Sequence, residues 1–342
     1  MNNMSWSFQQ IWNESLEQRE VRPLEARERI WASELGGAMV DRYLKMTATP
    51  MSNPPNPRSL RKFEAGNLME WVAGVILKRA GILKASQEWL PYQYPGLLKV
   101  TGKYDYTAGG KPDYERGMAS LKELSDLGLP PIFEKIGSNI VEYFSKKYPD
   151  GLKEITLEIK SCSSFSYDKY ERTKKPGPQH ILQSFHYLKA ENKEEAHVVY
   201  ISKDDLRMIE FGVFNPSTVE EDYKKDIEQM TKYLKDKVQP PLERPVSYDE
   251  DDGRFFANWK MGYSNYLTML YGYKDQNAFD TNWKPTASKW NRIFKRCVQG
   301  KTMTKLNLEI IPEVKKEFPA FDDMVGKARV AGLFKEEAED EN

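Results

Sequence analysis

A short run of alternating residues constrains this chain more than any other feature. In residues 155–160 (ITLEIK), apolar side chains at odd positions alternate with polar ones at even positions, the period-two pattern of a half-buried strand. The alternation places Glu158 and Lys160 side by side on one face and packs the odd-numbered residues into a core. A carboxylate and an ammonium two residues apart suit a metal-dependent hydrolase. Glutamate then holds a divalent cation, and lysine positions or activates the attacking water.

The segment that follows predicts a short amphipathic helix. Residues 180–190 come after a Pro-Gly-Pro turn at 176–178, and apolar side chains recur along them. Gln183 and Tyr187 are four residues apart, so they fall on one helical face. An amide and a phenol on that ridge can order a nucleotide phosphate or the lysine itself.

The acid-x-Lys triplet is a weak signal by itself, because 30% of the chain is charged. The triplet recurs at residues 191–193, 222–224 and 313–315, where no strand-like alternation surrounds it, and we interpret those copies as solvated charge pairs. For Glu158 alone, an exposed strand residue is the preferred interpretation. The pair together with its following helix favours chemistry.

Composition sets the remaining bounds. A chain of 342 residues allows one large domain or two modest ones with a sizeable core. Lys+Arg and Asp+Glu balance at 51 each, so any nucleic-acid binding must come from local patches. Cys162 and Cys297 cannot make a disulfide framework or a four-thiolate metal site, which favours a reducing compartment. No signal-peptide run or membrane-spanning stretch is present, and we expect a soluble, intracellular protein without a membrane partner.

The order of patterns predicts four parts. They are an N-terminal helical segment, an α/β core with a helical insertion, an aromatic and basic helical region, and an acidic tail: 1–57, 58–240 with the insertion at 113–150, 241–335, and 336–342. Within the core we expect helices and strands in alternation: a helix at 58–80, a strand at 97–107 with a turn at 108–110, a strand pair at 196–201 and 208–213, and a helix at 219–238.

Three further acids are candidates with competing interpretations. Glu70 lies inside the predicted helix 58–80, where a lone glutamate is usually solvated. Asp105 can meet Glu158 if their strands are neighbours in one sheet, or it is a turn-forming aspartate before the glycines, with about even odds. Asp113 is a rival for the same role, although its Gly-Gly-Lys-Pro context favours a loop or helix N-cap.

Two segments carry local positive charge. Residues 255–305 interleave aromatic and basic side chains, which can grip phosphates and stack bases. The competing interpretation is that the aromatics are core and the lysines a solvated face, and it is favoured for any single aromatic. Residues 169–175 lie between the two motifs, and we predict a substrate-facing loop there.

Four spaced motifs, taken in order, resemble the PD-(D/E)XK nuclease superfamily. They are G-x-x-x-E ending at Glu70, G-x-x-D ending at Asp105, Glu158-Ile-Lys160, and Q-x-x-x-Y from Gln183 to Tyr187. Within that superfamily the chain is most similar to the RecB-type branch, which includes CRISPR-associated and phage exonucleases. The resemblance covers residues 30–215 and implies an α/β, restriction-endonuclease-like core, a small mixed sheet flanked by helices.

The resemblance also implies a role for each motif residue. Asp105 and Glu158 would be the main metal ligands, joined by the backbone carbonyl of Ile159, and Glu70 would complete the metal site from upstream. Lys160 would be the catalytic lysine. Gln183 and Tyr187 would support the site or contact DNA. The implied cofactor is one or two Mg²⁺ or Mn²⁺ ions.

The chain departs from the family pattern in two places. Many relatives hold an iron–sulfur cluster, but residues 37–39 lack the N-terminal cysteine and Cys297 stands alone near the C-terminus, so we predict no cluster. The stretch between Asp105 and Glu158 is longer than usual. This length leaves Asp105 and Asp113 as alternatives for the metal ligand, and it suggests that the insertion shapes substrate access.

The expected activity is metal-dependent hydrolysis of single- or double-stranded DNA, with an exonuclease favoured over an endonuclease. Recombination, repair or phage DNA processing in a bacterial or phage-infected cell fits the resemblance. Two alternatives stay open. One is a catalytically idle DNA-binding or assembly protein on the same fold, and the other is a hydrolase of small phosphorylated substrates. Strand polarity and oligomeric state are left open.

Overall fold

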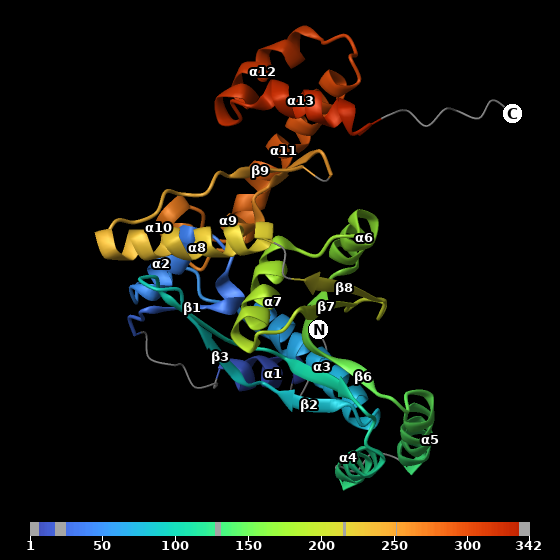
Figure 1. Cartoon of the computed structure of the whole chain (residues 1–342). Helices are drawn as coiled ribbons and strands as arrows, with labels where there is room; N and C mark the ends of the chain where they lie inside the picture. The colour runs from blue at the N-terminus through green and yellow to red at the C-terminus, as the bar shows by residue number, and fades with distance from the viewer. Residues whose placement is uncertain (1–6, 18–24, 127–130, 215–216, 251, 335–342) are drawn as a thin grey trace, which may run out of the picture. The chain divides into compact units, whose positions relative to one another are not determined.

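The computed structural model describes residues 7–17, 25–126, 131–214, 217–250 and 252–334 (Figure 1). The predicted acidic tail, 336–342, lies outside the described residues. The chain divides into two compact units. Unit 1 comprises Met1–Thr49 and Pro55–Pro240, and unit 2 comprises Pro50–Pro54 and Pro241–Asn342. In the described ranges, no helix is both long and apolar enough to cross a membrane.

Unit 1 is built on two small sheets. The first has three strands in the order β1-β4-β3: Arg29–Trp31, Lys99–Lys103 and Trp89–Tyr92. The second has five strands in the order β2-β5-β6-β7-β8: Leu83–Ser86, Tyr106–Gly110, Leu152–Cys162, Glu195–Ser202 and Met208–Phe214. In the second sheet β6 and β7 are parallel and the other neighbours are antiparallel, so the sheet is mixed.

Helices cover both faces of the five-stranded sheet. On one face, Met69, Ala73 and Leu77 of α3 (Pro57–Arg79) pack against Leu157 and Ile159 of β6. On the other, α6 (Ser164–Thr173) and α7 (Pro178–Glu191) supply apolar side chains against β7 and β8 (Figure 1). The predicted fold class, α/β with a small mixed sheet flanked by helices, is confirmed.

Because helices cover both faces of the five-stranded sheet, β6 is more deeply buried than its alternating pattern predicts. The alternation in residues 155–160 predicts a half-buried strand, but β6 is the middle strand of the sheet and both its faces are packed. Glu158 is therefore buried, with only 2% of its surface exposed. A polar residue on a covered face needs hydrogen-bond or ion-pair partners, and neighbouring side chains supply them for Glu158.

The three-stranded sheet is covered by α7 and by α8 (Ser217–Asp236). Their shared core contains large aromatic side chains, with Phe185 and Tyr187 from α7 and Tyr223 from α8 packed around Tyr104. Because α7 contacts strands of both sheets, it fixes one sheet against the other. The helix predicted at residues 219–238 is thus present, as is the strand pair β7–β8.

The prediction of an all-helical N-terminal segment is wrong in one place. Helices α1 (Phe8–Glu17) and α2 (Met39–Met46) and a 3₁₀ turn at Ala32–Glu34 are present. Between them, β1 pairs in parallel with β4, and Ile30 is fully buried in that pairing. A partner strand seventy residues further along the chain overrides the local helical pattern.

The predicted single strand at 97–107 is also wrong. The structure has two strands, β4 and β5, with Asp105 in the break between them, and residues 108–110 belong to β5 rather than to a turn. The pairing of β5 with β6 shifts register between Ala108 and Gly110. Gly109 has φ +140°, a conformation that glycine tolerates, so the glycines form a bulge and the strand continues.

The insertion is helical, as expected, and contains α4 (Tyr114–Asp126) and α5 (Pro131–Lys147), which lie side by side (Figure 1). Helix α3 begins where predicted. Asn56 caps it by accepting a hydrogen bond from the Ser59 N–H at 2.9 Å, and Pro57 occupies the first turn.

Unit 2 combines a two-stranded hairpin with short and long helices. The hairpin strands are β9 (Val246–Asp249) and β10 (Arg254–Ala257), and the helices are α9 (Trp259–Gly262), α10 (Leu267–Tyr271), α11 (Gln276–Val298), α12 (Lys305–Glu317) and α13 (Phe321–Val330). The prediction that the region 241–335 is helical is therefore wrong at β9 and β10. Phe255, Trp290 and Phe294 lie in the core of this unit, whereas Tyr263 is exposed.

Candidate active site

The pairing of β5 with β6 brings Asp105 to Glu158. Tyr106 lies opposite Leu157 in this antiparallel pair, so the same register carried one residue further sets Asp105 opposite Glu158. The Asp105 Oδ2 accepts a hydrogen bond of 2.7 Å from the backbone N–H of Ile159. Asp105 is only 8% exposed. The expectation that the two strands are neighbours is confirmed.

The carboxylate of Glu158 is satisfied on one oxygen only. Its Oε1 accepts from the ammonium of Lys160 and, at 2.7 Å, from Nε2 of Gln183. Among the residues that the structure describes, none donates to the other oxygen, Oε2, which is buried. A buried carboxylate oxygen without a donor is costly, so this atom is suited to a cation or to a substrate donor.

Lys160 lies on the same face of β6 as Glu158, as the alternation predicts. Its side chain is 24% exposed, so the ammonium is partly open to solvent while its partner is not. Burial lowers the pKa of Lys160, but the charges of Glu158 and Asp105 outweigh burial, and the net pKa is raised. Lys160 therefore stays charged at neutral pH.

Gln183 and Tyr187 share one face of α7, as predicted, and both are buried. Besides bonding Glu158, Nε2 of Gln183 donates to the Tyr187 hydroxyl at 2.9 Å. That hydroxyl donates in turn to the carbonyl of Lys103 at the end of β4, at 2.7 Å. The pair thus holds Glu158 in place and ties it to the second sheet.

A glycine makes this close packing possible. A Cβ on Gly102 would lie 2.6 Å from the Cβ of Ala32 and 3.2 Å from Cε1 of Tyr187. A larger residue there would clash with Ala32 and crowd the ring of Tyr187. The glycine of the G-x-x-D motif is therefore required mainly by the approach of Ala32.

Glu70 reaches the site through Gln87, a residue that no sequence motif marks. Gln87, in the connection between β2 and β3, donates from Nε2 to Glu70 at 2.6 Å and to Oδ1 of Asp105 at 3.5 Å. Its backbone is left-handed, with φ +55°, and its N–H bonds the carbonyl of Tyr104 at 3.1 Å. An isolated glutamine in a short connection carries no motif, so only the tertiary structure reveals this bridge.

Burial raises the pKa of all three carboxyl groups, and neighbouring carboxylate charge adds to the shift at Glu70 and at Glu158. Burial, followed by the charge of Asp105, raises the pKa of Glu70 to about 7. Burial raises the pKa of Glu158 to about 8, with Asp105 adding to the effect and Lys160 opposing it. Burial also raises the pKa of Asp105. Such a cluster retains protons near neutral pH and would release them on binding a cation.

Some of the oxygen atoms around Asp105 and Glu158 suit a hard divalent cation. The N–H and C=O of one strand residue lie on the same side of the strand, so the Ile159 carbonyl is directed toward Asp105. Carboxylate and carbonyl oxygens are the ligands that Mg²⁺ and Mn²⁺ prefer. Across the described ranges, no group of three or more His, Cys, Asp or Glu residues is arranged to hold a metal ion. The protein oxygens that could hold a cation here are therefore those of Asp105 and Glu158 and the backbone carbonyl of Ile159, with water completing the coordination.

Asp113 does not join this group. It caps α4, since its Oδ1 accepts from the N–H of Arg116 at 2.9 Å, and it also pairs with the Arg116 side chain. The N-cap interpretation is confirmed. Of the two rival aspartates, the fold brings Asp105 and not Asp113 to Glu158.

His180 was not predicted to have a role, yet it lies close to Lys160. Its Nδ1 is 2.6 Å from the hydroxyl of Tyr200 on β7. Burial, followed by the charge of Lys160, lowers the pKa of His180 to about 3, so the ring is neutral. The Tyr200 ring also stacks on Tyr170 of α6, with centroids 4.0 Å apart. These contacts connect α6 to the neighbourhood of Lys160.

The predicted substrate-facing loop at residues 169–175 is wrong in form. Helix α6 continues to Thr173, and Lys174, with φ +53°, ends it. The basic side chains therefore lie on a helix and its C-cap. A helix presents them in a fixed spacing that a loop would not.

Comparison with known proteins gives a limited result. No protein-family model matches the chain, and no curated protein matches it either. Among solved structures, the chain is similar to SSO0001, with 13% identity and a TM-score of 0.47, over 79% of this chain and 98% of that one.

It is also similar to an alkaline exonuclease, LHK-Exo, from Laribacter hongkongensis. The identity is 14% and the TM-score 0.35, over 67% of this chain and 97% of that one. The structure of LHK-Exo in complex with dAMP gives 11% identity and a TM-score of 0.34, over 67% of this chain and 93% of that one.

Proposed function

We propose that this chain is a metal-dependent nuclease that hydrolyses phosphodiester bonds in DNA. The observation that carries the proposal is the buried carboxylate of Glu158, which lies opposite Asp105, pairs with Lys160 and keeps Oε2 without a donor. A buried carboxyl–ammonium pair of this kind is retained in a core at considerable cost, which is typical of functional sites. The order of the four motifs in the sequence supports the same proposal.

Each side chain has a distinct task in this mechanism. Bound Mg²⁺ or Mn²⁺ would supply Lewis acidity toward the scissile phosphate and toward water. Asp105, Glu158 and the Ile159 carbonyl would hold the cation, and Glu70 would add negative charge from α3. Gln183 fixes Oε1 of Glu158 and so sets the direction of Oε2. Lys160, charged and partly exposed, orients the attacking water and stabilises negative charge on the phosphate.

We favour an exonuclease acting in recombination, repair or phage DNA processing, because the motif order is most similar to the RecB-type branch. A second candidate is a catalytically idle DNA-binding protein on the same fold. One observation favours it, since within the described ranges no three His, Cys, Asp or Glu side chains are grouped so that they could hold a metal ion. The intact Glu158–Lys160 pair argues against it, because an idle protein gains nothing from a buried charge.

Digestion assays test the proposal. Linear and closed-circular DNA, single- and double-stranded, would be incubated with Mg²⁺, Mn²⁺ or EDTA, using the wild type, Lys160→Ala and Lys153→Ala. Lys153 is a matched control, because it lies on the same strand but is exposed and pairs with Glu195 outside the site.

The nuclease proposal requires metal-dependent cleavage that Lys160→Ala abolishes and Lys153→Ala retains. Sparing of closed circles identifies an exonuclease. If neither metal gives cleavage above the Lys160→Ala background, the idle DNA-binding candidate replaces the nuclease.

A further inference from the structure

Phe165 is the starting point, because 83% of its surface is exposed although phenylalanine is usually buried. It lies in the first turn of α6, the helix that follows directly after β6 and its Lys160. Ser163 caps this helix, accepting a hydrogen bond from the N–H of Ser166 at 3.3 Å. The exposed ring is thus carried on a well-formed helix terminus and not on a loose loop.

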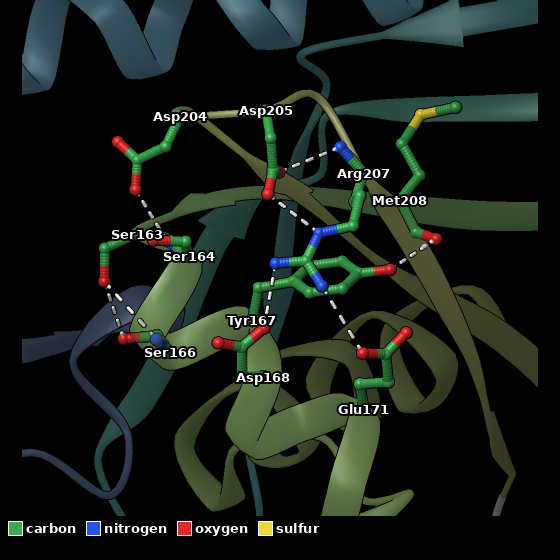
Figure 2. Close-up of polar contacts among 10 residues, drawn as sticks. All are labelled: Ser163, Ser164, Ser166, Tyr167, Asp168, Glu171, Asp204, Asp205, Arg207 and Met208. Carbon is green, nitrogen blue, oxygen red and sulfur yellow. Dashed lines mark hydrogen bonds and ion pairs between the residues drawn. The ribbon is translucent and has the colours of Figure 1, made fainter.

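One face of α6 is fixed to the turn between β7 and β8 (Figure 2). The N–H of Ser164 donates to Oδ2 of Asp204 at 2.8 Å. Arg207 forms ion pairs with Asp168 at 2.8 Å and Glu171 at 3.4 Å, and it also pairs with Asp205 at 2.8 Å.

The Arg207 guanidinium lies 4.5 Å from the centre of the Tyr167 ring, and the Tyr167 hydroxyl donates to the carbonyl of Met208 at 2.9 Å (Figure 2). Because these contacts hold one face of α6, the orientation of the opposite face is fixed as well.

Another side of α6 combines the aromatic ring with positive charge. Phe165, Lys169 and Arg172 follow at i, i+4 and i+7, so they lie on one stripe of the helix. Asp168 lies beside this stripe, but its charge, like that of Glu171, is paired with Arg207. The stripe of one aromatic ring and two cations is complementary to a nucleic-acid strand.

A second pair of cations lies beside the start of α6. The N–H of Lys203 donates to the carbonyl of Cys162, the last residue of β6, at 2.8 Å. Its Nζ donates to the carbonyl of Lys62 at 3.1 Å. Burial and the charge of Lys62 lower the pKa of Lys203, while Asp204 opposes the shift. A phosphate placed here would offset the repulsion between the two ammonium groups.

The geometry points to Phe165 as a base-stacking residue for a single DNA strand, whose phosphates Lys62 and Lys203 contact on the path to Lys160. This assignment rests on the proposed nuclease function and names its substrate class. Bases inside a duplex are already stacked on both sides, so the interior of a duplex offers this ring no partner, whereas an unpaired base offers it an open face. Phe165 is therefore a specificity residue that favours single-stranded ends.

The inference is tested by binding, in EDTA so that no cleavage occurs. Fluorescence anisotropy would report the Kd of a labelled single-stranded oligonucleotide and of a blunt duplex. A single-stranded probe containing 2-aminopurine would report stacking directly. The variants are Phe165→Ala, Phe165→Leu and Phe165→Trp. Phe214→Ala is the matched control, because Phe214 is also exposed, at 57%, but lies at the opposite end of the β7–β8 hairpin.

We expect Phe165→Ala and Phe165→Leu to weaken single-strand binding roughly 5- to 100-fold, the range that one stacked base provides. They should also lose the 2-aminopurine quench, with little change for the duplex. Phe165→Trp should keep both, and Phe214→Ala should match the wild type. If Phe165→Leu binds and quenches like the wild type, or if Phe165→Ala does, base stacking by Phe165 is overturned.

The two proposals fail separately. Metal-dependent cleavage by the wild type, combined with unchanged binding in all Phe165 variants, overturns the stacking role and leaves the nuclease standing. Aromatic-dependent binding of single strands without any cleavage removes the nuclease and supports a single-strand binding role for the stripe.

Discussion

The carboxylate of Asp105 accepts a 2.7 Å hydrogen bond from the backbone N–H of Ile159, the residue between Glu158 and Lys160. This bond joins Asp105, in the break between β4 and β5, to β6, the middle strand of the five-stranded sheet. It fixes Asp105 across from Glu158, and it does so through the backbone, independently of any side chain at position 159. The proposed metal-binding role of Asp105 can therefore be tested without disturbing the strand.

Asp105→Asn should reduce metal-dependent cleavage by at least about 100-fold, because the amide keeps an acceptor for Ile159 but loses the charge that a cation requires. Initial rates on linear DNA would measure the loss. Asp113→Asn is the control, since asparagine caps helices as well as aspartate does, and we expect its rate to stay within about twofold of the wild type. The reverse pattern would make Asp113 the functional acid.

Local patterns predicted only part of this site. The strand carrying Glu158 and Lys160 and the helix carrying Gln183 and Tyr187 follow from alternation and from four-residue spacing, which depend on neighbouring residues alone. The burial of Glu158 did not follow, because it depends on helices that cover both faces of the sheet.

The remaining differences also arise from contacts between distant segments. The strand break at Asp105 lies where the chain passes from the three-stranded sheet to the five-stranded one. The bulge at Gly109 opposite β6 turns an apparent turn signal into strand. Gln87 has no neighbour in sequence that marks it, and its two carboxylate partners come from α3 and from the β4–β5 break. The positions of these residues in the sequence do not predict such long-range contacts.

Tyr187→Phe should destabilise the protein by about 1–3 kcal/mol, because it leaves the carbonyl of Lys103 and the Nε2 of Gln183 each short of a buried partner. Urea denaturation at pH 7 would measure the change. Tyr114→Phe, which alters an exposed hydroxyl, should change stability by less than about 0.5 kcal/mol. Equal effects of the two substitutions would contradict the proposed hydrogen-bond chain.

The pH dependence of cleavage should reflect the raised pKa values of the carboxyl cluster. A protonated carboxyl cannot hold a cation, and the pKa is about 7 for Glu70 and about 8 for Glu158. At limiting Mg²⁺, cleavage should therefore rise as the pH increases through this range, and saturating Mg²⁺ should move the rise to lower pH. Rate profiles from pH 6 to 9 at two Mg²⁺ concentrations would measure both effects.

Glu70→Gln provides the matching variant. It removes one titrating group and the negative charge that raises the pKa of Glu158, so the rise should begin at lower pH than in the wild type. Its apparent affinity for Mg²⁺ should be weaker at pH 8. A profile that is flat from pH 6 to 9 in both proteins would show that these carboxyls are not the groups that bind the cation.

His186 should make the protein less stable in mild acid. Its ring is fully buried between Leu90 and Tyr223. The Leu90 carbonyl can only accept, so the Nε2 of His186 carries the proton at 2.9 Å and Nδ1 accepts from the Tyr223 hydroxyl, also at 2.9 Å. Burial lowers the pKa of His186 to about 4 from an ordinary value of 6.5, so the ring stays neutral in the folded state.

The direction of the effect follows from proton uptake. Below pH 6.5 the unfolded chain protonates this histidine while the folded chain does not, so the free energy of unfolding falls as the pH drops toward 4. The full loss is roughly 3 kcal/mol, at about 1.4 kcal/mol for each unit of pKa shift. His180 acts in the same direction, because its pKa is also lowered.

Urea denaturation at pH 7 and pH 4.5 would measure this loss for the wild type, His186→Gln and His197→Gln. His186→Gln should be less stable at pH 7 but lose less on acidification, because glutamine can still donate to Leu90 and does not titrate. His197→Gln should instead lose more stability on acidification than the wild type does. Glu210 raises the pKa of His197, so that histidine stabilises the fold at low pH, and its removal should increase the acid loss. Parallel behaviour of the two variants would contradict the neutral state of His186.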